Sequence, residues 1–457
     1  MTGLQPYGRL RTSKLAWAPE LPEHWSESTI GRIATVYAGG TPDRGNPTYW
    51  EGGTIPWLNS GSVNDWVITE PSELITPLAL AGSSTRWVPP RSIVMALAGQ
   101  GRTKGMAARV ELETTLNQSL AAVVPTSAVE YRFVQYWLAA NYASIRNLAG
   151  GDLRDGLNLQ HIKSVGLPLP PIAEQRAIAD FLDRETAEID AFIEDQEELI
   201  RVLSERRDAT ISSAVTRGLD RDALLKQTGI AWLPQMPAHW RLGRLRDAVR
   251  SSRNGVWGGE PGTAFDIRCV RVADFDRPSQ RVRDDNVTYR SVLPSERVGR
   301  ILHEGDLLLE KSGGGEKSPV GFVVLYDKSA PAICSNFVAR IVLGSGQHPK
   351  YWSYVHRFFY AARLTQRSIK QSTGIQNLDQ GSYFDERIGI PPITEQEDIA
   401  AYLDTATAEI DASVADAREA IALLRERRAA LISAAVTGKI DVLEGSATNG
   451  SSARRCV

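Results

Sequence analysis

The sequence of 457 residues contains two copies of one segment, and no other feature constrains its fold as strongly. Residues 170–216 align without a gap on residues 391–437, with 28 identities in 47 positions. Upstream, AWAPELPEHW at 16–25 is matched by AWLPQMPAHW at 231–240. Between these anchors the similarity largely vanishes. The chain is therefore predicted to hold two copies of one unit, each a variable globule of roughly 140 residues followed by a nearly constant segment.

Each constant segment is predicted to form one long α-helix. Neither Gly nor Pro interrupts residues 172–216, and Ala, Glu, Leu and Arg dominate them. Apolar residues common to both copies recur at spacings that average close to a heptad, the pattern of helices that pair along a seam. The candidate pairing positions are Leu182, Ile189, Ile193, Ile200 and Leu203 in the first copy, and Leu403, Ile410, Val414, Ile421 and Leu424 in the second.

A solitary structural helix or a dimerisation coil would give the same pattern, because heptads are common. Two nearly identical copies in one chain favour pairing with each other. If a pseudo-twofold axis relates the two halves, the helices run antiparallel as a coiled coil and hold the globules at opposite ends.

The variable globules mix α and β patterns, which predicts an α+β fold class. SIVMALAG at 92–99 and GDLLLEKSGGG at 305–315 are apolar, β-favouring and bounded by glycine-rich turns. Aromatic-rich helical stretches at 131–148 and 351–369 are expected to belong to the cores. The predicted boundaries are a first globule at 1–169, a helix at 170–216, a linker and second globule at 217–390, a helix at 391–437 and a disordered tail at 438–457.

Charge is divided between the helices and the rest of the chain. Residues 173–210 and 394–431 together carry a net charge of -12, so the remainder carries +10 in a chain of net charge -2. Within it, residues 241–300 contain 13 arginines, no lysine and 8 acidic residues. Such a field attracts phosphates, whereas DNA would repel the acidic helices. A solvated arginine surface is the alternative interpretation of the same run.

Composition argues against several classes of protein. The three cysteines, Cys269, Cys334 and Cys456, lack C-x-x-C spacing, which disfavours a disulfide framework or a zinc knuckle and fits a reducing compartment. No apolar run is long enough for a bilayer, and the polar start lacks a signal-peptide core. We therefore expect a soluble cytoplasmic protein without a membrane partner.

No catalytic or metal-binding constellation is expected. The segment Asn46-Pro-Thr-Tyr-Trp50 is similar to a motif of amino-methyltransferases, but Thr48 replaces its second proline and no glycine-rich cofactor loop follows a strand nearby. Residues 313–318 are expected to form a glycine-rich turn rather than a phosphate loop. The six histidines show no metal-ligand spacing, and the equivalent His24 and His239 are expected to make matched structural contacts.

Two variable globules that alternate with two long repeated helices resemble the specificity subunit of type I restriction-modification systems, over nearly the whole chain. The resemblance is carried by the PPI-x-EQ-x-x-IA-x-x-LD openings at Pro170 and Pro391, and by Asn158-Leu159 and Asn377-Leu378 upstream. GGTPDRGNPTYWEGGTIPWLNSGSV at 39–63 is similar to the segment that commonly opens a target-recognition domain of this family. GDLLLEKSGGG followed by PVGFVVL is similar to a second recurring segment, but the second globule lacks a GGTP copy.

The resemblance implies a non-catalytic subunit that recognises double-stranded DNA for restriction and for methylation in host defence. Each globule would read one half of a bipartite, asymmetric sequence, and the helices would set the spacer and dock two modification (methyltransferase) subunits. Restriction subunits would complete the complex. The S-adenosylmethionine cofactor is expected in the methyltransferase partner, so this chain is predicted to carry no cofactor of its own.

Candidate DNA contacts are polar residues in the turns of the globules. Arg and Asn can make bidentate contacts to guanine and adenine, whereas Lys more often holds phosphate. The candidates are Thr41, Arg44, Ser60, Ser62, Asn64, Arg102 and Lys104 in the first globule, and Arg253, Asn254, Arg268, Arg271, Lys311 and Lys317 in the second.

Two alternative functions fit the same sequence. The specificity subunit of a fused restriction-methylation enzyme, of the type IIB kind, uses the same architecture. A coiled-coil assembly protein whose globules bind protein would instead show no salt-dependent binding to duplex DNA.

Overall fold

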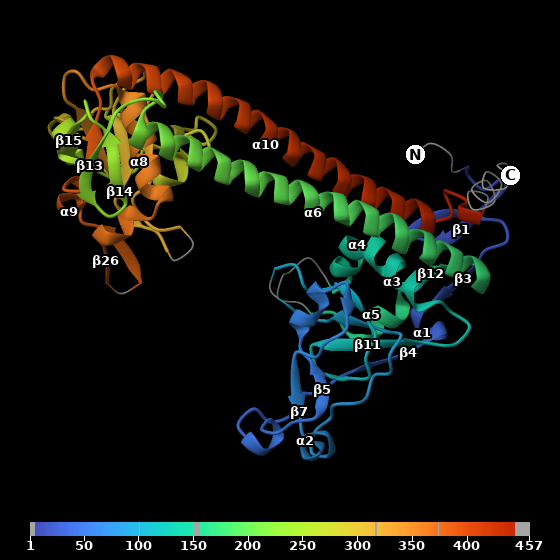
Figure 1. Cartoon of the computed structure of the whole chain (residues 1–457). Helices are drawn as coiled ribbons and strands as arrows, with labels where there is room; N and C mark the ends of the chain where they lie inside the picture. The colour runs from blue at the N-terminus through green and yellow to red at the C-terminus, as the bar shows by residue number, and fades with distance from the viewer. Residues whose placement is uncertain (1–4, 100, 150–155, 316–317, 373, 444–457) are drawn as a thin grey trace. The chain divides into compact units, whose positions relative to one another are not determined.

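The computed structural model describes residues 5–99, 101–149, 156–315, 318–372 and 374–443. The chain divides into two compact units: unit 1 comprises Met1–Asp195 with Ala420–Val457, and unit 2 comprises Gln196–Glu419. Their boundaries fall inside the long helices α6 (Ile172–Arg217) and α10 (Ile393–Val436). Each unit therefore holds one globule, the first part of the helix that follows it and the last part of the other helix (Figure 1).

A small hairpin opens each globule and carries the repeated tryptophan motif. It comprises β1 (Leu10–Leu15) with β2 (Ala18–Pro22) in unit 1, and β13 (Leu225–Ile230) with β14 (Leu233–Pro237) in unit 2. The next strand then pairs with the strand that leads into the proline pair. These two-stranded sheets are β3 (Ser26–Thr29) with β12 (Gly166–Leu169), and β15 (Arg241–Arg244) with β28 (Arg387–Ile390).

Two further sheets form the body of the first globule. The larger has the order β4-β11-β8-β9-β6, and the smaller has the order β10-β5-β7. Their strands are β4 (Ala34–Ala38), β5 (Ile55–Leu58), β6 (Val67–Ile68), β7 (Glu73–Ile75), β8 (Ser92–Ala96), β9 (Ala107–Val110), β10 (Thr115–Leu116) and β11 (Leu120–Pro125). Every residue of β8 is buried, which fits the apolar run at 93–96 that follows Ser92.

The short helices of the first globule lie on the side of the globule that faces the long helices, and in the turns between its strands. They are α1 (Ile30–Ile33), α2 (Pro77–Ala81), α3 (Tyr131–Ala140), α4 (Tyr142–Arg146) and α5 (Leu159–Ser164), with 3₁₀ turns η1 (Pro47–Tyr49), η2 (Ser60–Asn64) and η3 (Asn147–Ala149). In Figure 1, α3 and α4 lie between the larger sheet and α6. The aromatic residues of α3 are buried, with Phe133, Tyr136 and Trp137 in the core as predicted.

The second globule repeats both sheet orders, with one additional edge strand in the larger sheet, although its sequence has diverged. Its larger sheet has the order β16-β25-β21-β23-β19-β18, its smaller sheet β20-β17-β24, and a third sheet β22-β27-β26. The strands are β16 (Val249–Asn254), β17 (Asp266–Val270), β18 (Phe275–Asp276), β19 (Arg281–Val282), β20 (Tyr289–Ser291), β21 (Leu307–Glu310), β22 (Ser312–Gly313), β23 (Val323–Leu325), β24 (Ala332–Cys334), β25 (Val338–Leu343), β26 (Ile369–Ser372) and β27 (Ile375–Leu378). Its helices are α7 (Pro294–Arg297), α8 (Pro349–Ala361) and α9 (Gln380–Phe384), with η4 (Leu245–Ala248), η5 (Val272–Asp274) and η6 (Leu364–Ser368).

Both long helices begin after a proline pair and end at a glycine. Gly218 and Gly438 follow them with φ of 73° and 68°, the left-handed conformation that glycine adopts at low cost. In unit 1 the last turns of α10 lie against the first turns of α6, because Arg428 pairs with Asp190 at 2.8 Å and Gly438 approaches Trp25, which bonds Glu174. The helix segments within this unit are therefore antiparallel.

Unit 2 has the same internal arrangement. Arg207 pairs with Asp411 at 2.6 Å, and Gly218 approaches Glu395 in the first turn of α10. Each unit has one main core shared by its globule and its helix segments, with Ile178 and Leu182 joined by Ile432 in unit 1, and Leu403 by Ile211 in unit 2. The predicted combination of α+β globules with two long helices is confirmed. The pseudo-twofold relation of the halves stays a prediction.

The ten predicted pairing positions of the long helices differ in how deeply they are buried. Leu182, Ile189, Leu403, Ile410 and Ile421 are buried, whereas Ile193, Ile200, Leu203, Val414 and Leu424 are of intermediate exposure. Leu182, Ile189 and Leu403 belong to the main cores of the units, and Ile193 and Leu424 pack against the core of unit 1. The predicted tail lies outside the described residues from 444 onward, and on the described chain no helix is long and apolar enough to span a membrane.

Candidate nucleic-acid interface

The repeated Glu-Gln pair at the start of each long helix fastens the helix to its globule. The Glu174 carboxylate accepts a hydrogen bond from Trp25 Nε1 at 2.9 Å and lies 2.9 Å from His24 Nε2. Glu395 repeats these contacts with Trp240 at 3.0 Å and His239 at 2.8 Å. The two histidines therefore make matched structural contacts, as the sequence predicted.

The glutamine that follows connects the same helix start to the aromatic helix of the globule. Gln175 accepts from the backbone N–H of Glu130, the residue before α3, at 2.9 Å and donates to Pro170 O at 2.8 Å. Gln396 accepts from the backbone N–H of His348, the residue before α8, and donates to Pro391 O, both at 3.0 Å. Each glutamine thus satisfies an unpaired N–H at a helix start.

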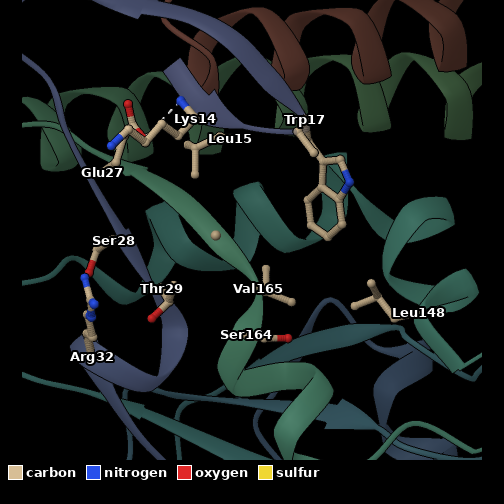
Figure 2. A pocket seen from close by; sticks show the side chains of 12 residues that line it. Lys14, Leu15, Trp17, Glu27, Ser28, Thr29, Arg32, Leu148, Ser164 and Val165 are labelled. Atoms are coloured by element: carbon tan, nitrogen blue, oxygen red, sulfur yellow. Dashed lines mark hydrogen bonds between the residues drawn. The ribbon is translucent and has the colours of Figure 1, made fainter.

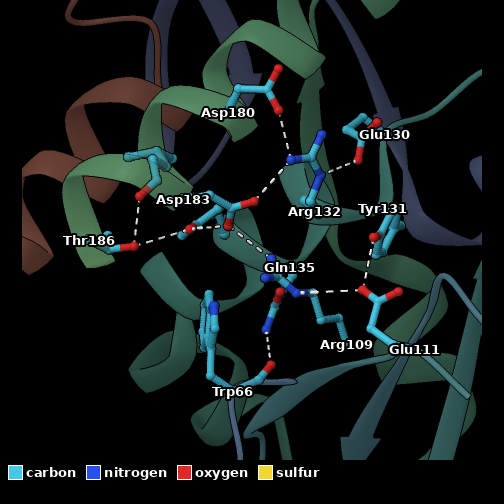
Figure 3. A network of polar contacts seen from close by, with 12 residues as sticks. Trp66, Arg109, Glu111, Glu130, Tyr131, Arg132, Gln135, Asp180, Asp183 and Thr186 are labelled. Carbon is cyan, nitrogen blue, oxygen red and sulfur yellow. Dashed lines mark hydrogen bonds and ion pairs between the residues drawn. The ribbon is translucent and has the colours of Figure 1, made fainter. Parts of the chain in front are cut away.

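An aspartate nine residues after each of these glutamates completes the attachment of the helix to its globule. Asp183 accepts from Arg109 and Arg132, each at 2.9 Å, and from Tyr136 at 2.7 Å (Figure 3). Burial acts to raise the pKa of Asp183, but the hydrogen bonds from Arg109 and its other donors outweigh it and hold that pKa below the usual range. In unit 2, Asp404 accepts from Lys350 and, at 3.0 Å, from Tyr354.

These repeated contacts explain why the PPI-x-EQ-x-x-IA-x-x-LD motif recurs. Its Glu, Gln and Asp each bind the globule, so the direction in which each globule leaves its helix is fixed by several bonds. A tyrosine joins each network to a threonine of the helix, through Tyr136 and Thr186 at 3.3 Å and through Tyr354 and Thr407 at 3.2 Å. The motif was recognised from sequence, but its role in attachment was not.

The candidate residues of the first globule lie mostly in exposed turns of the smaller sheet. Arg44 makes two bonds to Glu73, at 2.6 and 2.8 Å, and its guanidinium lies 3.8 Å from the Trp50 ring centroid. This hydrogen-bonded pair lowers the pKa of Glu73. Thr41 donates to Gln118. Arg44 is thus held in a fixed orientation while half of its side chain stays exposed.

The turn around η2 carries three more candidates. Ser60 begins η2, the Ser62 and Ser72 hydroxyls lie 2.6 Å apart, and Asn64 Nδ2 donates to Gly61 O at 2.8 Å. Arg102 is exposed in the turn between β8 and β9. Lys104 in the same turn is only 3% exposed. Lys104 therefore needs a rearrangement of the turn before it can contact DNA.

The candidates of the second globule fall into two groups. Arg253 and Asn254 are exposed on the edge strand β16, where Arg253 donates to Val298 O at 2.9 Å and Asn254 accepts from Gln380 at 2.9 Å. Arg268 and Arg271 are held by carboxylates, Asp284 and Asp274, each at 2.8 Å. A base contact by this second group would require an ion pair to open.

The two remaining candidates lie in the glycine-rich turn region. Lys311 follows β21 and is half-buried, and its backbone N–H donates to Phe337 O at 2.9 Å. Lys317 lies outside the described residues, as does Glu316 of the Gly313–Ser318 segment.

Unit 1 contains a cavity of about 470 Å³ between the first hairpin, β3 and β12 (Figure 2). Trp17 and Leu148 line one side, and Lys14, Glu27 and Arg32 lie across from them. None of the sequence candidates lines it. Among the described residues, no group of three or more His, Cys, Asp and Glu side chains is placed to hold a metal ion.

The chain is similar to known proteins along most of its length. The family described as Type I restriction modification DNA specificity domain matches residues 22–200. The specificity subunit of the type I restriction enzyme StySPI from Salmonella potsdam is 22% identical over 411 residues, which cover 86% of this chain and 85% of that protein. The chain is thus similar to type I specificity subunits.

Further type I specificity subunits and a solved structure match over different lengths. The EcoR124I/EcoR124II specificity subunit from Escherichia coli is 26% identical over 203 residues, 44% of each chain, so the alignment spans less than half of that relative. A solved structure titled as the basis of complex assembly and conformational transition of the type I R-M system has a TM-score of 0.61. It is 16% identical and covers 91% of this chain and 98% of that chain, which supports the fold.

The fold locates the loop that sequence comparison could not find in the second globule. Gly39 and Gly40 donate to Leu120 O and Leu116 O, and Gly255 and Val256 donate to Val338 O and Cys334 O at the same places in the sheets. A Cβ at Gly39 would lie 2.0 Å from Leu116 O, and one at Gly255 would lie 2.0 Å from Cys334 O. Gly255 is therefore the counterpart of Gly39.

A signal for this equivalence is present in the sequence. Gly39 and Gly255 follow the repeated His-Trp pairs, which end at residues 25 and 240, at nearly the same distance. Only glycine fits where the backbone passes this close to a neighbouring strand. The polar turn that follows Gly255 therefore occupies the place of the GGTP segment.

Both Asn-Leu pairs lie upstream of the strand that precedes each proline pair, but they are not equivalent positions of the fold. Asn158 caps α5, whereas α9 is capped by Asp379. Leu378 N donates to Lys311 O, and its counterpart is Leu157 N, which donates to Leu97 O. The chemical likeness of two Asn-Leu pairs concealed a shift of two residues.

The charge of the arginine run at 241–300 is neutralised to a greater extent than its composition indicated. Nine of the thirteen arginines in 241–300 lie within 4 Å of a carboxylate. Arg253, Arg297 and Arg300 instead donate to backbone carbonyls of the same globule. Much of the run therefore stabilises the fold, and the excess positive charge is concentrated near β16 and α7.

Proposed function

We propose that this chain is the DNA sequence-recognition subunit of a type I restriction-modification complex, and that each globule reads one half of a bipartite, asymmetric site. The carrying observation is that both globules have the same strand order and the same Glu, Gln and Asp attachments while their exposed turns differ. A reader of two unlike half-sites needs this combination of a repeated framework and divergent contact residues.

The exposed turns supply suitable chemistry for reading base edges. Arg44 in unit 1 and Arg253 with Asn254 in unit 2 can form the bidentate contacts that distinguish guanine and adenine in the major groove. Exposed Arg102 is suited to a phosphate or base contact at the β8–β9 turn. Arg44 must release Glu73 to make an end-on contact of this kind, and its ring contact with Trp50 keeps the guanidinium oriented meanwhile.

The long helices have a separate role in this proposal. They set the spacer between the half-sites and dock two modification subunits, with restriction subunits completing the assembly in the cytoplasm. Methyl transfer from S-adenosylmethionine takes place in the modification subunits, and this chain contributes recognition rather than a catalytic group. The similar proteins from Escherichia coli and Salmonella potsdam are type I specificity subunits, which favours this assignment over a fused restriction-methylation enzyme.

The test uses the chain assembled with the modification subunits that accompany it. Binding to duplex DNA should weaken steeply between 50 and 200 mM salt, by roughly 10³-fold for about six neutralised phosphates. Sequencing of methylated sites should show two short specified sequences separated by unspecified bases. A complex that assembles but shows no salt-dependent binding to duplex DNA would favour the coiled-coil assembly alternative and contradict the proposal.

A further inference from the structure

Unit 2 contains a cavity of about 660 Å³ where its globule meets parts of α6 and α10. Five arginines line it: Arg207, Arg277, Arg357, Arg363 and Arg418. Three aspartates lie among them, so the lining carries a formal charge of +2 from five positive and three negative groups. The volume falls within the range of ligand sites, and the charge favours an anion.

Two of these arginines have buried hydrogen-bond donors without a partner among the described residues. Arg207 is 6% exposed and pairs with Asp411 at 2.6 Å, but its Nε is unbonded. Arg357 lies 3.3 Å from Asp208, and its Nε is also unbonded. Burial, together with the nearby positive charge of Arg207, lowers the pKa of Arg357. The positive charge of these two buried guanidinium groups beside the cavity favours an anion in it.

Two further arginines of the lining, Arg363 and Arg418, are exposed. The side chains of Arg363 and Arg418 form no ion pair or hydrogen bond with described residues. Arg363 has a φ of 56°, a left-handed conformation that is uncommon for a residue with a side chain. The backbone strain at Arg363 places a cation at the start of η6, where the cavity lies.

This arginine cluster is not part of the repeated framework. The residues before α3 and α8, Glu130 and His348, occupy equivalent positions, which places Ala139 where α8 has Arg357. Arg428, the repeat counterpart of Arg207, lies 5.5 Å from the Trp66 ring centroid in unit 1. The repeated helices therefore carry similar arginines, but the cluster around Arg207 is a property of unit 2.

We propose that this cavity binds phosphate groups of the DNA backbone, which deepens and rests on the proposed function. Guanidinium groups match the geometry of phosphate oxygens and remain charged when partly buried. The two aromatic rings of the lining, Phe322 and Tyr360, already lie 4.7 and 5.6 Å from the Arg277 guanidinium. Their contact with Arg277 favours a phosphodiester over a nucleotide whose base would stack on those rings.

The test compares variants in the complex assembled with the modification subunits. R363A/R418A removes the two exposed charges and leaves the buried pairs of Arg207 and Arg357 in place. R363K/R418K keeps the charge, and R241A/R367A removes two exposed arginines that lie outside the cavity near Asp247 and Glu386. The slope of log K against log salt should fall by about 2 for R363A/R418A only, with the methylated sequence unchanged.

Uncharged methylphosphonates placed singly along the duplex locate the contact. One or two positions should weaken the wild-type complex and leave R363A/R418A unaffected. An unchanged slope, or no such position, overturns the cavity proposal while bipartite methylation by the wild type leaves the proposed function standing. Binding of inorganic phosphate or ATP that is lost in R363A/R418A, with DNA binding unaltered, would also overturn it by identifying a free ligand. Failure of the wild-type complex to bind duplex DNA would instead contradict the proposed function.

Discussion

Replacing Asp183 by Asn should loosen the first globule from its helix far more than Asp404→Asn loosens the second. The Asp183 side chain is 26% exposed and accepts bonds from two arginines and a tyrosine. Arg132 retains Asp180 and Glu130 at 2.8 Å, but Arg109 keeps only Glu111 at 3.7 Å. Loss of the charged bond to Arg109 accounts for about 2 kcal/mol, and weakening at Arg132 adds about 1 kcal/mol.

The equivalent change in unit 2 is a matched control. Asp404 and Lys350 are 37% and 39% exposed, so water replaces most of the lost ion pair and the cost is about 1 kcal/mol. Hydrogen exchange reports on each unit separately through peptides of α3 and α8. D183N should accelerate exchange in α3 by about 100-fold, and D404N should accelerate exchange in α8 by about 5-fold.

The pH dependence follows from the lowered pKa of Asp183. A carboxylate whose folded pKa lies below its unfolded value of about 3.9 stabilises the fold fully above that value. Its contribution is lost as the pH falls through the folded pKa. The difference in α3 exchange between the wild type and D183N should therefore be constant from pH 5 to 7 and narrow below pH 4. Equal effects of D183N on α3 and α8, or a change in α3 below 3-fold, would refute the attachment role.

Three further changes test the cores and the close backbone approaches. Gly39→Ala and Gly255→Ala should each destabilise their globule by more than about 2 kcal/mol in urea titrations, because a Cβ would lie 2.0 Å from a carbonyl oxygen, whereas Gly8→Ala in open space should be neutral. Leu182→Asp should cost several kcal/mol by burying a charge, and Leu203→Asp, at a half-buried position, should cost less in the same assay; equal costs would contradict the assigned cores. Burial raises the pKa of Cys269 and Cys334 to about 12, so mass spectrometry should find both unalkylated by iodoacetamide at pH 8 until urea is added, and rapid labelling of the native chain would count against their burial.

The repeat made the larger features of this fold predictable from sequence. A long segment without Gly or Pro indicated each long helix, and the matched His and Trp residues indicated a contact common to both copies. Both signals are local in the chain and can therefore be recognised from sequence. The common strand order of the globules was not predictable, since the same sheet is built there from unrelated apolar residues. The equivalence of Gly39 and Gly255 rests on backbone hydrogen bonds. These bonds constrain the identity of a single glycine in each copy, so the sequence alone gives little sign of the equivalence.

The candidate interface was less predictable than the fold for a physical reason. The sequence identifies an arginine but not the group that it contacts. Arg271 and Arg253 were therefore equally good candidates, although Arg271 is held by Asp274 and Arg253 is exposed on an edge strand. Lys104 had the pattern of an exposed turn residue although it is buried. The Glu, Gln and Asp of the repeated motif were visible, but their partners lie more than forty residues away in the chain.

Exchange of the first globule most directly tests whether each globule reads one half-site. Residues 31–165, which lie within unit 1, are replaced by the same region of a related specificity subunit, and the hybrid is assembled with the modification subunits. Glu174 and Asp183 lie outside the exchanged region, so the hybrid keeps the helix residues of both attachments and should assemble. Sequencing of methylated sites should then show one half of the recognised sequence changed, with the other half and the spacer unchanged. An active hybrid in which both halves change would contradict the account.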